Sequence, residues 1–200
     1  MLERDEISNL IELAKHGSSD AFGEIILKHE RFVYNVVYRM LPNPEDAKDI
    51  SQEVFIKAYR YLSKFDNKAS FSTWIYRIAV NTCIDEIRKR KGKETISLDD
   101  EIEGAEGSIK NQFADKYVDI ERDIIEKEGL ESIRQAVNKL SEEHKVVVTL
   151  RDMEGLAYDE IADITQTSLG TVKSRLSRAR KALKELILLD REHNLISIVK

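Results

Sequence analysis

The residues best suited to binding chemistry lie in a short basic segment near the C-terminus. Residues 168–184 contain six basic and no acidic residues, a net charge of +6. On a helical wheel of about 100° per residue, one apolar stripe is formed by Val172, Leu176, Ala179 and Leu183. The opposite surface, called the recognition face, carries Thr171, Lys173, Ser174, Ser177, Arg178 and Lys181. Cations suit phosphates, and Arg and short hydroxyl side chains suit base edges in the major groove, so this face predicts DNA recognition.

Two features place the recognition face in a helix-turn-helix. Residues 158–164 form a second apolar-periodic segment, and only residues 165–168 separate it from the basic one. Ser168 is a natural N-cap, so the helix that follows begins with free amides that can meet a phosphate. A solvated amphipathic helix is the alternative interpretation of a basic face. The preceding helix and the tight turn favour DNA binding.

A second basic segment, residues 68–93, combines cations with aromatic side chains. It carries seven basic and two acidic residues, a net charge of +5. Residues 71–91 are predicted to form a helix. Four of its side chains lie within about 60° of one another and are called the strand-binding face: Trp74, Arg77, Asn81 and Arg88. Rings that stack on bases and cations that meet phosphates suit single-stranded or unstacked nucleic acid. Packing of Trp74 in the core is the alternative.

An acidic face is predicted on the helix at residues 44–64. Asn43 can cap this helix, and Pro44 suits its first position. The acidic face consists of Asp46, Asp49, Gln52 and Glu53. Carboxylates at this spacing could serve acid–base or metal chemistry, but no His or Cys accompanies them. We expect either a solvated surface or a docking surface for a basic partner.

The elements that carry these faces are predicted to be helices throughout. The chain has 200 residues, with only two prolines and eight glycines, and 34% of its residues are charged. Together with long 3.6-residue periodicity, this composition predicts an all-α fold. The predicted helices span residues 7–16, 21–41, 44–64, 71–91, 119–140 and 142–153, followed by the two of the helix-turn-helix.

An acidic segment divides the chain. Residues 94–128 carry twelve acidic and four basic residues, and periodicity is lost over residues 92–118. This predicts a flexible linker between two small domains. The predicted boundaries are residues 1–92 for the first domain, 93–119 for the linker, 120–190 for the helix-turn-helix domain and 191–200 for a tail.

Composition argues against several classes of function. The sequence has no zinc-spaced cluster, catalytic triad, phosphate-binding glycine loop or dinucleotide fingerprint, so no enzyme, cofactor, metal site or small-molecule substrate is expected. The single cysteine, Cys83, suits a small core position. The charged residues 1–6 lack the apolar core of a signal peptide, and no apolar run could span a bilayer. A cytoplasmic protein is expected. The net charge of −5 hides the two basic segments, which are the more informative feature.

Two separated stretches resemble one family, the bacterial RNA polymerase sigma factors of the extracytoplasmic-function group. Residues 46–59 (DAKDISQEVFIKAY) and 71–81 (FSTWIYRIAVN) resemble their core-binding and promoter-melting domain. Residues 158–183, above all GTVKSRLSRAR at 170–180, resemble their C-terminal promoter-reading domain. The short chain and the absence of a third domain also match this group. The resemblance covers about residues 18–92 and 120–188.

The resemblance implies a transcription initiation factor that binds core RNA polymerase, directs it to specific promoters and promotes promoter melting. The acidic face would grip the clamp helices of the polymerase's largest subunit. The loop at residues 65–70 would capture a flipped-out base of the minus-ten element through the loop triplet Asp66, Asn67 and Lys68. The strand-binding face would hold the strand or adjoining duplex, and the recognition face would read the minus-thirty-five element. The linker would thread the polymerase's RNA channel.

The family also implies an anti-sigma partner, often membrane-bound, that sequesters the factor until a stress response. Three residues depart from the family pattern: Gln166 replaces the usual glycine of the turn, Thr167 an apolar residue and Ala157 a Ser or Thr cap. A left-handed Gln166 would cost roughly 1 kcal/mol. Two other classes stay open. A DNA-binding regulator with a ligand-sensing N-terminal half would bind duplex tightly without polymerase, and an enzyme acting on nucleic acid would show activity without it.

Overall fold

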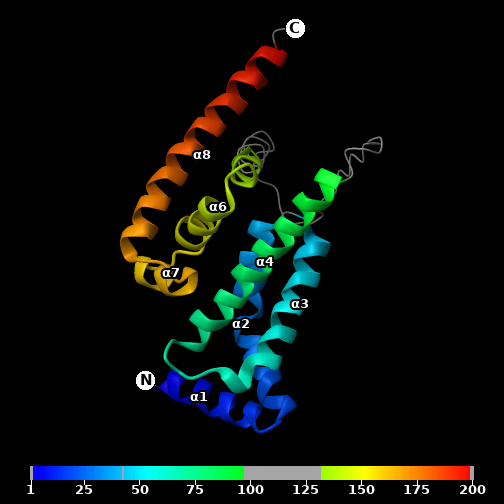
Figure 1. Cartoon of the computed structure of the whole chain (residues 1–200), viewed down its shortest axis with the longest axis vertical. Helices are drawn as coiled ribbons and strands as arrows, with labels where there is room; N and C mark the ends of the chain where they lie inside the picture. Colours follow the sequence, from blue (N-terminus) through cyan, green and yellow to red (C-terminus); the bar gives the residue numbers. More distant parts are fainter. Residues whose placement is uncertain (1, 42, 97–131, 199–200) are drawn as a thin grey trace, which may run out of the picture.

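The computed structural model describes residues 2–41, 43–96 and 132–198, and within these ranges it contains helices and no strands (Figure 1). The predicted all-α fold is therefore confirmed. Most of the predicted linker and the start of the helix predicted at residues 119–140 lie outside the described residues. The part of that helix that is described, residues 132–138, is helical.

The N-terminal part is a helical bundle whose helix ends follow local capping signals. Its elements are α1 (Leu2–Lys15), α2 (Ser19–Met40), α3 (Pro44–Tyr61), the 3-10 helix η1 (Leu62–Lys64) and α4 (Phe71–Ile96). Gly17 separates α1 from α2 with φ of +96°, a conformation that favours glycine. The Ser18 hydroxyl then accepts a hydrogen bond from the Ala21 amide at 3.2 Å. Asn43 Oδ1 accepts one from the Glu45 amide at 2.9 Å, which confirms Asn43 as the N-cap of α3.

Helix α4 continues past the predicted domain boundary. Gly92 lies inside the helix, which ends at Ile96, so α4 extends beyond the end predicted for it at residue 91. An isolated glycine costs about 1 kcal/mol relative to alanine in a helix, too little to end one whose neighbours are good helix formers. Lys91, Lys93 and Glu94 are such neighbours.

The C-terminal part contains the predicted helix-turn-helix. Its named elements are α6 (Glu142–Val148), the π-helix η3 (Thr149–Met153), α7 (Tyr158–Thr165) and α8 (Leu169–Ile198). The Ser at position 141, just before the helix predicted at residues 142–153, is expected to cap that helix through its hydroxyl. Ser141 does occupy the N-cap position of α6, but its side chain makes no capping hydrogen bond, so this expectation is wrong. Helix α8 extends to Ile198, through most of the stretch predicted as a tail.

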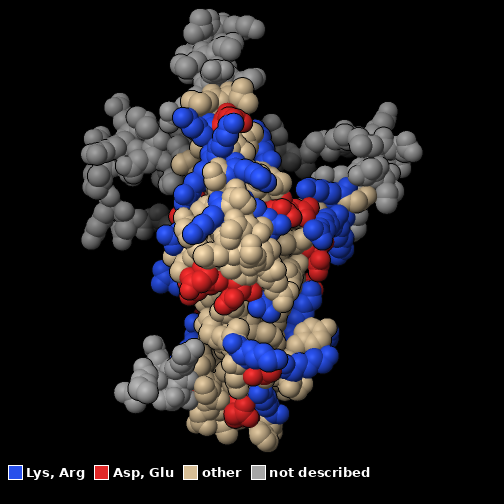
Figure 2. Space-filling model, turned by 60° about the vertical axis from the view of Figure 1, so that its left-hand side comes forward, with Lys and Arg blue, Asp and Glu red and all other residues tan. Residues whose placement is uncertain are grey.

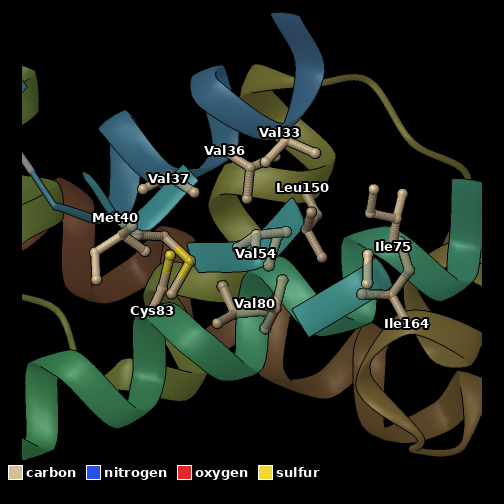
Figure 3. Close-up of a cluster of buried hydrophobic side chains, with 14 of the residues drawn as sticks. Val33, Val36, Val37, Met40, Val54, Ile75, Val80, Cys83, Leu150 and Ile164 are labelled. Atoms are coloured by element: carbon tan, nitrogen blue, oxygen red, sulfur yellow. The ribbon is translucent and has the colours of Figure 1, made fainter. Parts of the chain in front are cut away.

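The two parts pack against each other and share one apolar core. Helix α7 lies beside α4, and η3 contacts α2 (Figure 1). The buried side chain of Leu150 lies among Val33, Val36 and Val54 of the N-terminal part (Figure 3). Ile164 of α7 lies beside Ile75 of α4 in the same cluster. The sequence predicted two domains joined by a linker but contained no signal that they pack together.

Candidate nucleic-acid interface

Helix α8 presents the recognition face to solvent. Val172, Leu176 and Ala179 are buried, which confirms the predicted apolar stripe, and Leu183 is half-buried. On the recognition face Thr171 is half-buried and the other five side chains are exposed. The Ser168 hydroxyl accepts a hydrogen bond from the Thr171 amide at 3.1 Å, so Ser168 caps α8 as predicted. Figure 2 shows basic side chains gathered over the upper part of this side of the molecule, where α8 lies.

Two arginines at the edges of the recognition face are held by carboxylates. Arg175 Nη2 lies 2.8 Å from Glu143 Oε1, and Arg180 Nε donates to Asp152 Oδ2 at 3.0 Å. The Asp152 carboxylate raises the pKa of Arg180. Within the described residues, Lys173, Arg178 and Lys181 make no ion pair. The centre of the face is therefore available for phosphates and base edges.

The turn before α8 contains one non-glycine residue with strained, left-handed backbone geometry. Gln166 is left-handed, with φ of +53°, at the position where glycine is usual in the family that the sequence resembles. The Thr167 amide then donates to the Ala162 carbonyl at 3.0 Å, which satisfies the end of α7. At the other end of α7, the Ala157 amide donates to Glu160 Oε2 at 2.8 Å. This bond supplies half of a capping box in the absence of a Ser or Thr side chain.

The strand-binding face is assembled on α4 but is only partly open. Asn81 and Arg88 are exposed, whereas Trp74 and Arg77 are half-buried. The Trp74 ring packs on Phe65 and Phe71, with centroid distances of 5.2 and 5.3 Å, so it lies at the edge of the core. The packing of Trp74 against core residues is therefore confirmed, and its role in strand binding stays a prediction.

Two cations of the strand-binding face donate hydrogen bonds to oxygen atoms of the helix-turn-helix part. Arg77 Nη2 donates to the Asp163 backbone carbonyl at 2.7 Å. Arg88 Nε donates to Glu142 Oε2 at 2.9 Å. Sequence reasoning missed Asp163 and Glu142 as partners because both contacts depend on how the two parts pack.

The loop triplet lies exposed between η1 and α4. Asn67 is left-handed, with φ of +59°, a conformation that Asn tolerates better than most residues. Asp66 Oδ2 lies 2.7 Å from Lys68 Nζ, and this contact lowers the pKa of Asp66. Two members of the triplet, Asp66 and Lys68, line a hollow together with Phe65, Ala69, Trp74, Arg77 and Asp163 of α7. Asn67 lines a neighbouring groove instead. That hollow has a volume of about 330 Å³.

Two side chains of the acidic face on α3 are paired with cations of this protein, and the other two are exposed to solvent. Asp46 accepts a hydrogen bond from Arg90 Nη1 at 2.5 Å, which ties α3 to α4 and lowers the pKa of Asp46. Glu53 pairs with Lys57 on the same helix at 2.8 Å. Asp49 and Gln52 are exposed and make no ion pair or side-chain hydrogen bond with a described residue. The open end of the acidic face is therefore at Asp49 and Gln52.

An apolar groove that the sequence did not predict lies beside Gln52. It has a volume of about 380 Å³ and includes Ile26 and Tyr34 of α2 and Phe55 of α3 in its lining. The exposure of Tyr34, 37% of its surface, shows that α2 and α3 leave part of their apolar surface open. A partner that docks on the acidic face meets apolar surface next to it.

The described residues hold no group of three or more His, Cys, Asp and Glu side chains that could bind a metal ion. None of the helices in the described ranges is both long enough and apolar enough to cross a membrane. Cys83 lies on the buried side of α4, and burial raises the pKa of its thiol to about 12, so it is a core residue as predicted.

The fold and the faces together define a class. In the part of the chain that the structure describes, the protein is all-helical, with an N-terminal bundle and a C-terminal helix-turn-helix. The capped second helix of the latter exposes hydroxyls and three cations that make no ion pair with a described residue. These are the features of a DNA-binding protein.

Comparison with known proteins identifies the family within this class. Residues 25–93 match Sigma-70 region 2, and residues 130–183 match Sigma-70 region 4. The ECF RNA polymerase sigma factor SigW of Bacillus subtilis is 38% identical over 180 residues, 90% of this chain and 95% of that protein. The RNA polymerase sigma-H factor of Pseudomonas aeruginosa is 33% identical, over 94% of this chain and 96% of that protein. The chain belongs to the extracytoplasmic-function sigma factors, which bind core RNA polymerase and direct it to promoters.

Solved structures share the fold. CnrH in complex with the cytosolic domain of CnrY superposes with a TM-score of 0.66 at 22% identity, covering 92% of this chain and 99% of that one. The sigma factor RpoE of Bartonella quintana, in complex with the anti-sigma factor NepR, superposes with a TM-score of 0.62 at 24% identity, covering 84% and 98%. These likenesses support the helical arrangement.

Proposed function

We propose a division of promoter recognition among the faces of this sigma factor. The recognition face on α8 reads the minus-thirty-five element. The loop triplet and the strand-binding face on α4 hold the minus-ten element as it melts. The acidic face, with Asp49 and Gln52 at its open end, binds the clamp helices of the largest polymerase subunit. In this proposal the protein contributes binding energy that helps to unstack the promoter bases, and the polymerase performs the chemistry.

One observation carries the proposal: helix α8 begins at a side-chain cap and exposes Lys173, Arg178 and Lys181 without a described acidic partner. A solvated helix has no need of a tight turn strained at Gln166, whereas a recognition helix must be held at a fixed angle to its neighbour. The apolar groove beside Gln52 supports the docking role of the acidic face, since interface cores combine apolar and polar surface.

We further propose that an anti-sigma protein controls this factor. Both structural relatives were solved in complex with a partner chain, and the partner of the Bartonella quintana protein is the anti-sigma factor NepR. The proposal includes a cytoplasmic factor that a membrane-bound partner can sequester until a stress signal releases it.

Run-off transcription tests the proposed division. Core RNA polymerase is supplied with a fragmented genomic library, with and without this protein, and new starts that share two upstream motifs give the promoter. Arg178→Ala should weaken binding at one promoter position by about 1–3 kcal/mol and relax its sequence preference. Asp49→Ala should weaken polymerase binding and leave that preference unchanged.

Matched controls separate these effects from changes in net charge. Lys139→Ala removes an exposed cation outside α8, and Glu24→Ala removes an exposed carboxylate of α2 that lies outside the acidic face and outside both DNA-binding faces. Neither should alter promoter choice or polymerase affinity. The same defect in Arg178→Ala and Asp49→Ala would contradict the division. Specific duplex binding by the protein alone, with no new starts, would favour a conventional regulator.

A further inference from the structure

We propose that Glu143 and Asp152 determine the sequence specificity of the recognition face: they hold Arg175 and Arg180 beside that face and so keep both arginines from phosphates of arbitrary sequence. All four residues lie in the helix-turn-helix part. The two carboxylates act through the arginines and are therefore positioning residues. The inference rests on the proposed function, because it concerns how selectively the recognition face reads the minus-thirty-five element.

Each arginine is bound by a carboxylate from the helices that precede the turn. Asp152 of η3 binds Arg180 with both oxygens, since Arg180 Nε donates to Oδ2 at 3.0 Å and Nη2 donates to Oδ1. Glu143 of α6 lies with its Oε1 2.8 Å from Arg175 Nη2. A two-point contact between a guanidinium and a carboxylate fixes both the position and the direction of the side chain. Asp152 therefore orients Arg180 away from a free choice of phosphate partner.

The two pairs flank the recognition face on opposite sides. On a wheel of about 100° per residue, Arg175 lies roughly 60° to one side of Val172 and Arg180 roughly 80° to the other. Val172 is buried, so both arginines lie between the buried stripe and the exposed recognition face. The Arg180 side chain is 51% exposed, so it could turn toward a phosphate if Asp152 did not hold it.

The π-helix η3 explains how one helical stretch brings a carboxylate to each side of α8. Glu143 and Asp152 are nine residues apart, and at about 100° per residue an uninterrupted α-helix would place them on opposite faces. The wider turn of η3 contains Asp152 and changes this register. Turns of this kind are rare and occur frequently at functional sites.

These carboxylates should matter most for DNA of arbitrary sequence. Non-specific binding comes almost entirely from cations that neutralise phosphates. A loosely bound duplex can use any free cation near the face, whereas a duplex whose base edges fit the face is held in one register. In that register Lys173, Arg178 and Lys181, which make no ion pair with a described residue, supply the contacts. The carboxylates therefore lower the affinity for non-specific duplex more than the affinity for the promoter.

A purely structural brace would behave differently. If the ion pairs only held α8 at its angle, loss of a carboxylate would weaken duplex binding and would add no phosphate contact. If they withhold cations, loss of a carboxylate strengthens binding to random duplex and makes that binding more sensitive to salt. The sign of the change separates the two roles.

Two variants remove one carboxylate charge each and nearly preserve the size of the side chain: Asp152→Asn and Glu143→Gln. Their matched controls are Asp159→Asn on α7 and Glu185→Gln on α8, which make the same changes at exposed carboxylates. Neither control residue forms an ion pair with a described residue. Circular dichroism verifies that each variant is folded.

A double-mutant cycle tests whether each carboxylate acts through its arginine. Asp152→Asn is repeated in an Arg180→Gln background, and Glu143→Gln in an Arg175→Gln background. The effect of removing the carboxylate should disappear in both backgrounds, because the arginine that it releases is no longer present.

The first measurement is the affinity of the full-length protein for a labelled duplex of random sequence, by fluorescence anisotropy over a range of salt concentrations. Asp152→Asn should bind about threefold more tightly at about 50 mM salt, and its log K should fall more steeply with log salt by about 0.9. The gain should therefore shrink roughly 3.5-fold between about 50 and 200 mM salt. Glu143→Gln should show a smaller gain, since the Arg175 side chain is only 24% exposed.

The second measurement uses the holoenzyme of core RNA polymerase and this protein. Run-off transcription from the promoter proceeds while a random-sequence duplex is added as competitor. With Asp152→Asn, about threefold less competitor should halve the transcript, because the non-specific affinity rises and the promoter affinity does not. Asp159→Asn should match the wild type.

Several outcomes would overturn the inference. One is an effect of Asp152→Asn no larger than that of Asp159→Asn, and another is a gain that persists after Arg180→Gln. Weaker binding of random duplex would identify a structural brace instead. Tighter random-duplex binding with unchanged sensitivity to competitor would show that promoter binding gains equally. The proposed function fails separately: it is contradicted if Arg178→Ala leaves the promoter choice of the holoenzyme unchanged, whatever Asp152→Asn does.

Discussion

The recognition face on α8 and the strand-binding face on α4 use the same kinds of side chain, but only the first lies open in this structure. Lys173, Arg178 and Lys181 are exposed on α8. On α4, Arg77 is held by the Asp163 carbonyl and Arg88 by Glu142. Residue chemistry therefore sets what each face can bind, and the packing of the two parts sets which face is accessible.

The difference follows from where each face sits relative to the shared core. The buried stripe of α8 packs inside its own part of the molecule, so the opposite face points outward. The strand-binding face lies next to the buried residues Phe71 and Ile75, where α7 also packs. A face beside an interdomain seam can be covered by small domain motions.

Loss of core packing between η3 and the N-terminal helices should have the largest effect on the difference in accessibility between the two faces. Leu150→Ala leaves a cavity between η3 and the N-terminal helices and should lower the free energy of unfolding by about 2–5 kcal/mol. Leu189→Ala removes a similar side chain that is 53% exposed on α8 and should change stability by less than about 0.5 kcal/mol. Urea unfolding followed by Trp74 emission gives both values. Equal losses would show that Leu150 holds no special position.

Acid should weaken the contact between Glu142 of α6 and the cations of α4, and so loosen the packing of the two parts, while the recognition face stays unchanged. Burial pushes the pKa of Glu142 upward, but hydrogen bonds from Arg88 and Lys91 outweigh it and hold the pKa below its usual value. The Glu142 contacts therefore stabilise closure above the unfolded-state pKa, and this contribution is lost as pH falls through the lowered pKa. Lys145, on the same helix, also interacts with this carboxylate, and burial lowers the pKa of its ammonium group.

The effect of acid should be modest, roughly 0.2–1 kcal/mol, because the partners of Glu142 are exposed. Quenching of Trp74 by acrylamide should rise between about pH 6 and pH 3. Glu142→Gln should already be partly open at neutral pH and should show a smaller change. An identical acid response in the variant would assign the opening to other carboxylates.

The smallest expected effect concerns the turn that orients the recognition face. Gln166→Gly relieves a left-handed residue and should raise the free energy of unfolding by up to about 1 kcal/mol, since the added freedom of glycine in the unfolded chain offsets part of the gain. Thr167→Gly, where φ is not positive, should lower it. Thermal unfolding by circular dichroism measures both. Destabilisation by Gln166→Gly would mean that the Gln side chain contributes contacts of its own.

Local signals in the sequence determined much of the fold. The caps at Ser18, Asn43 and Ser168 and the buried stripe of α8 were predictable because they depend on residues three or four positions apart. The predicted end of the α4 helix at residue 91 is wrong, because strong helix formers outweigh one glycine at position 92. The hydroxyl cap expected at Ser141 failed as well. The roles given to the candidate DNA-binding and polymerase-binding residues stay predictions.

Only the tertiary structure decided which of these residues are free to act. Asp46 and Asp49 look alike in the sequence, yet Arg90, 44 residues away from Asp46, binds only the former. Arg77 and Arg178 look alike as well, yet Asp163 holds the first from 86 residues away. The sequence by itself determined the helices, their apolar stripes and their basic and acidic faces. How two helices from separate parts of the chain pack is fixed by shape and burial over the whole core, and no local pattern contains that information.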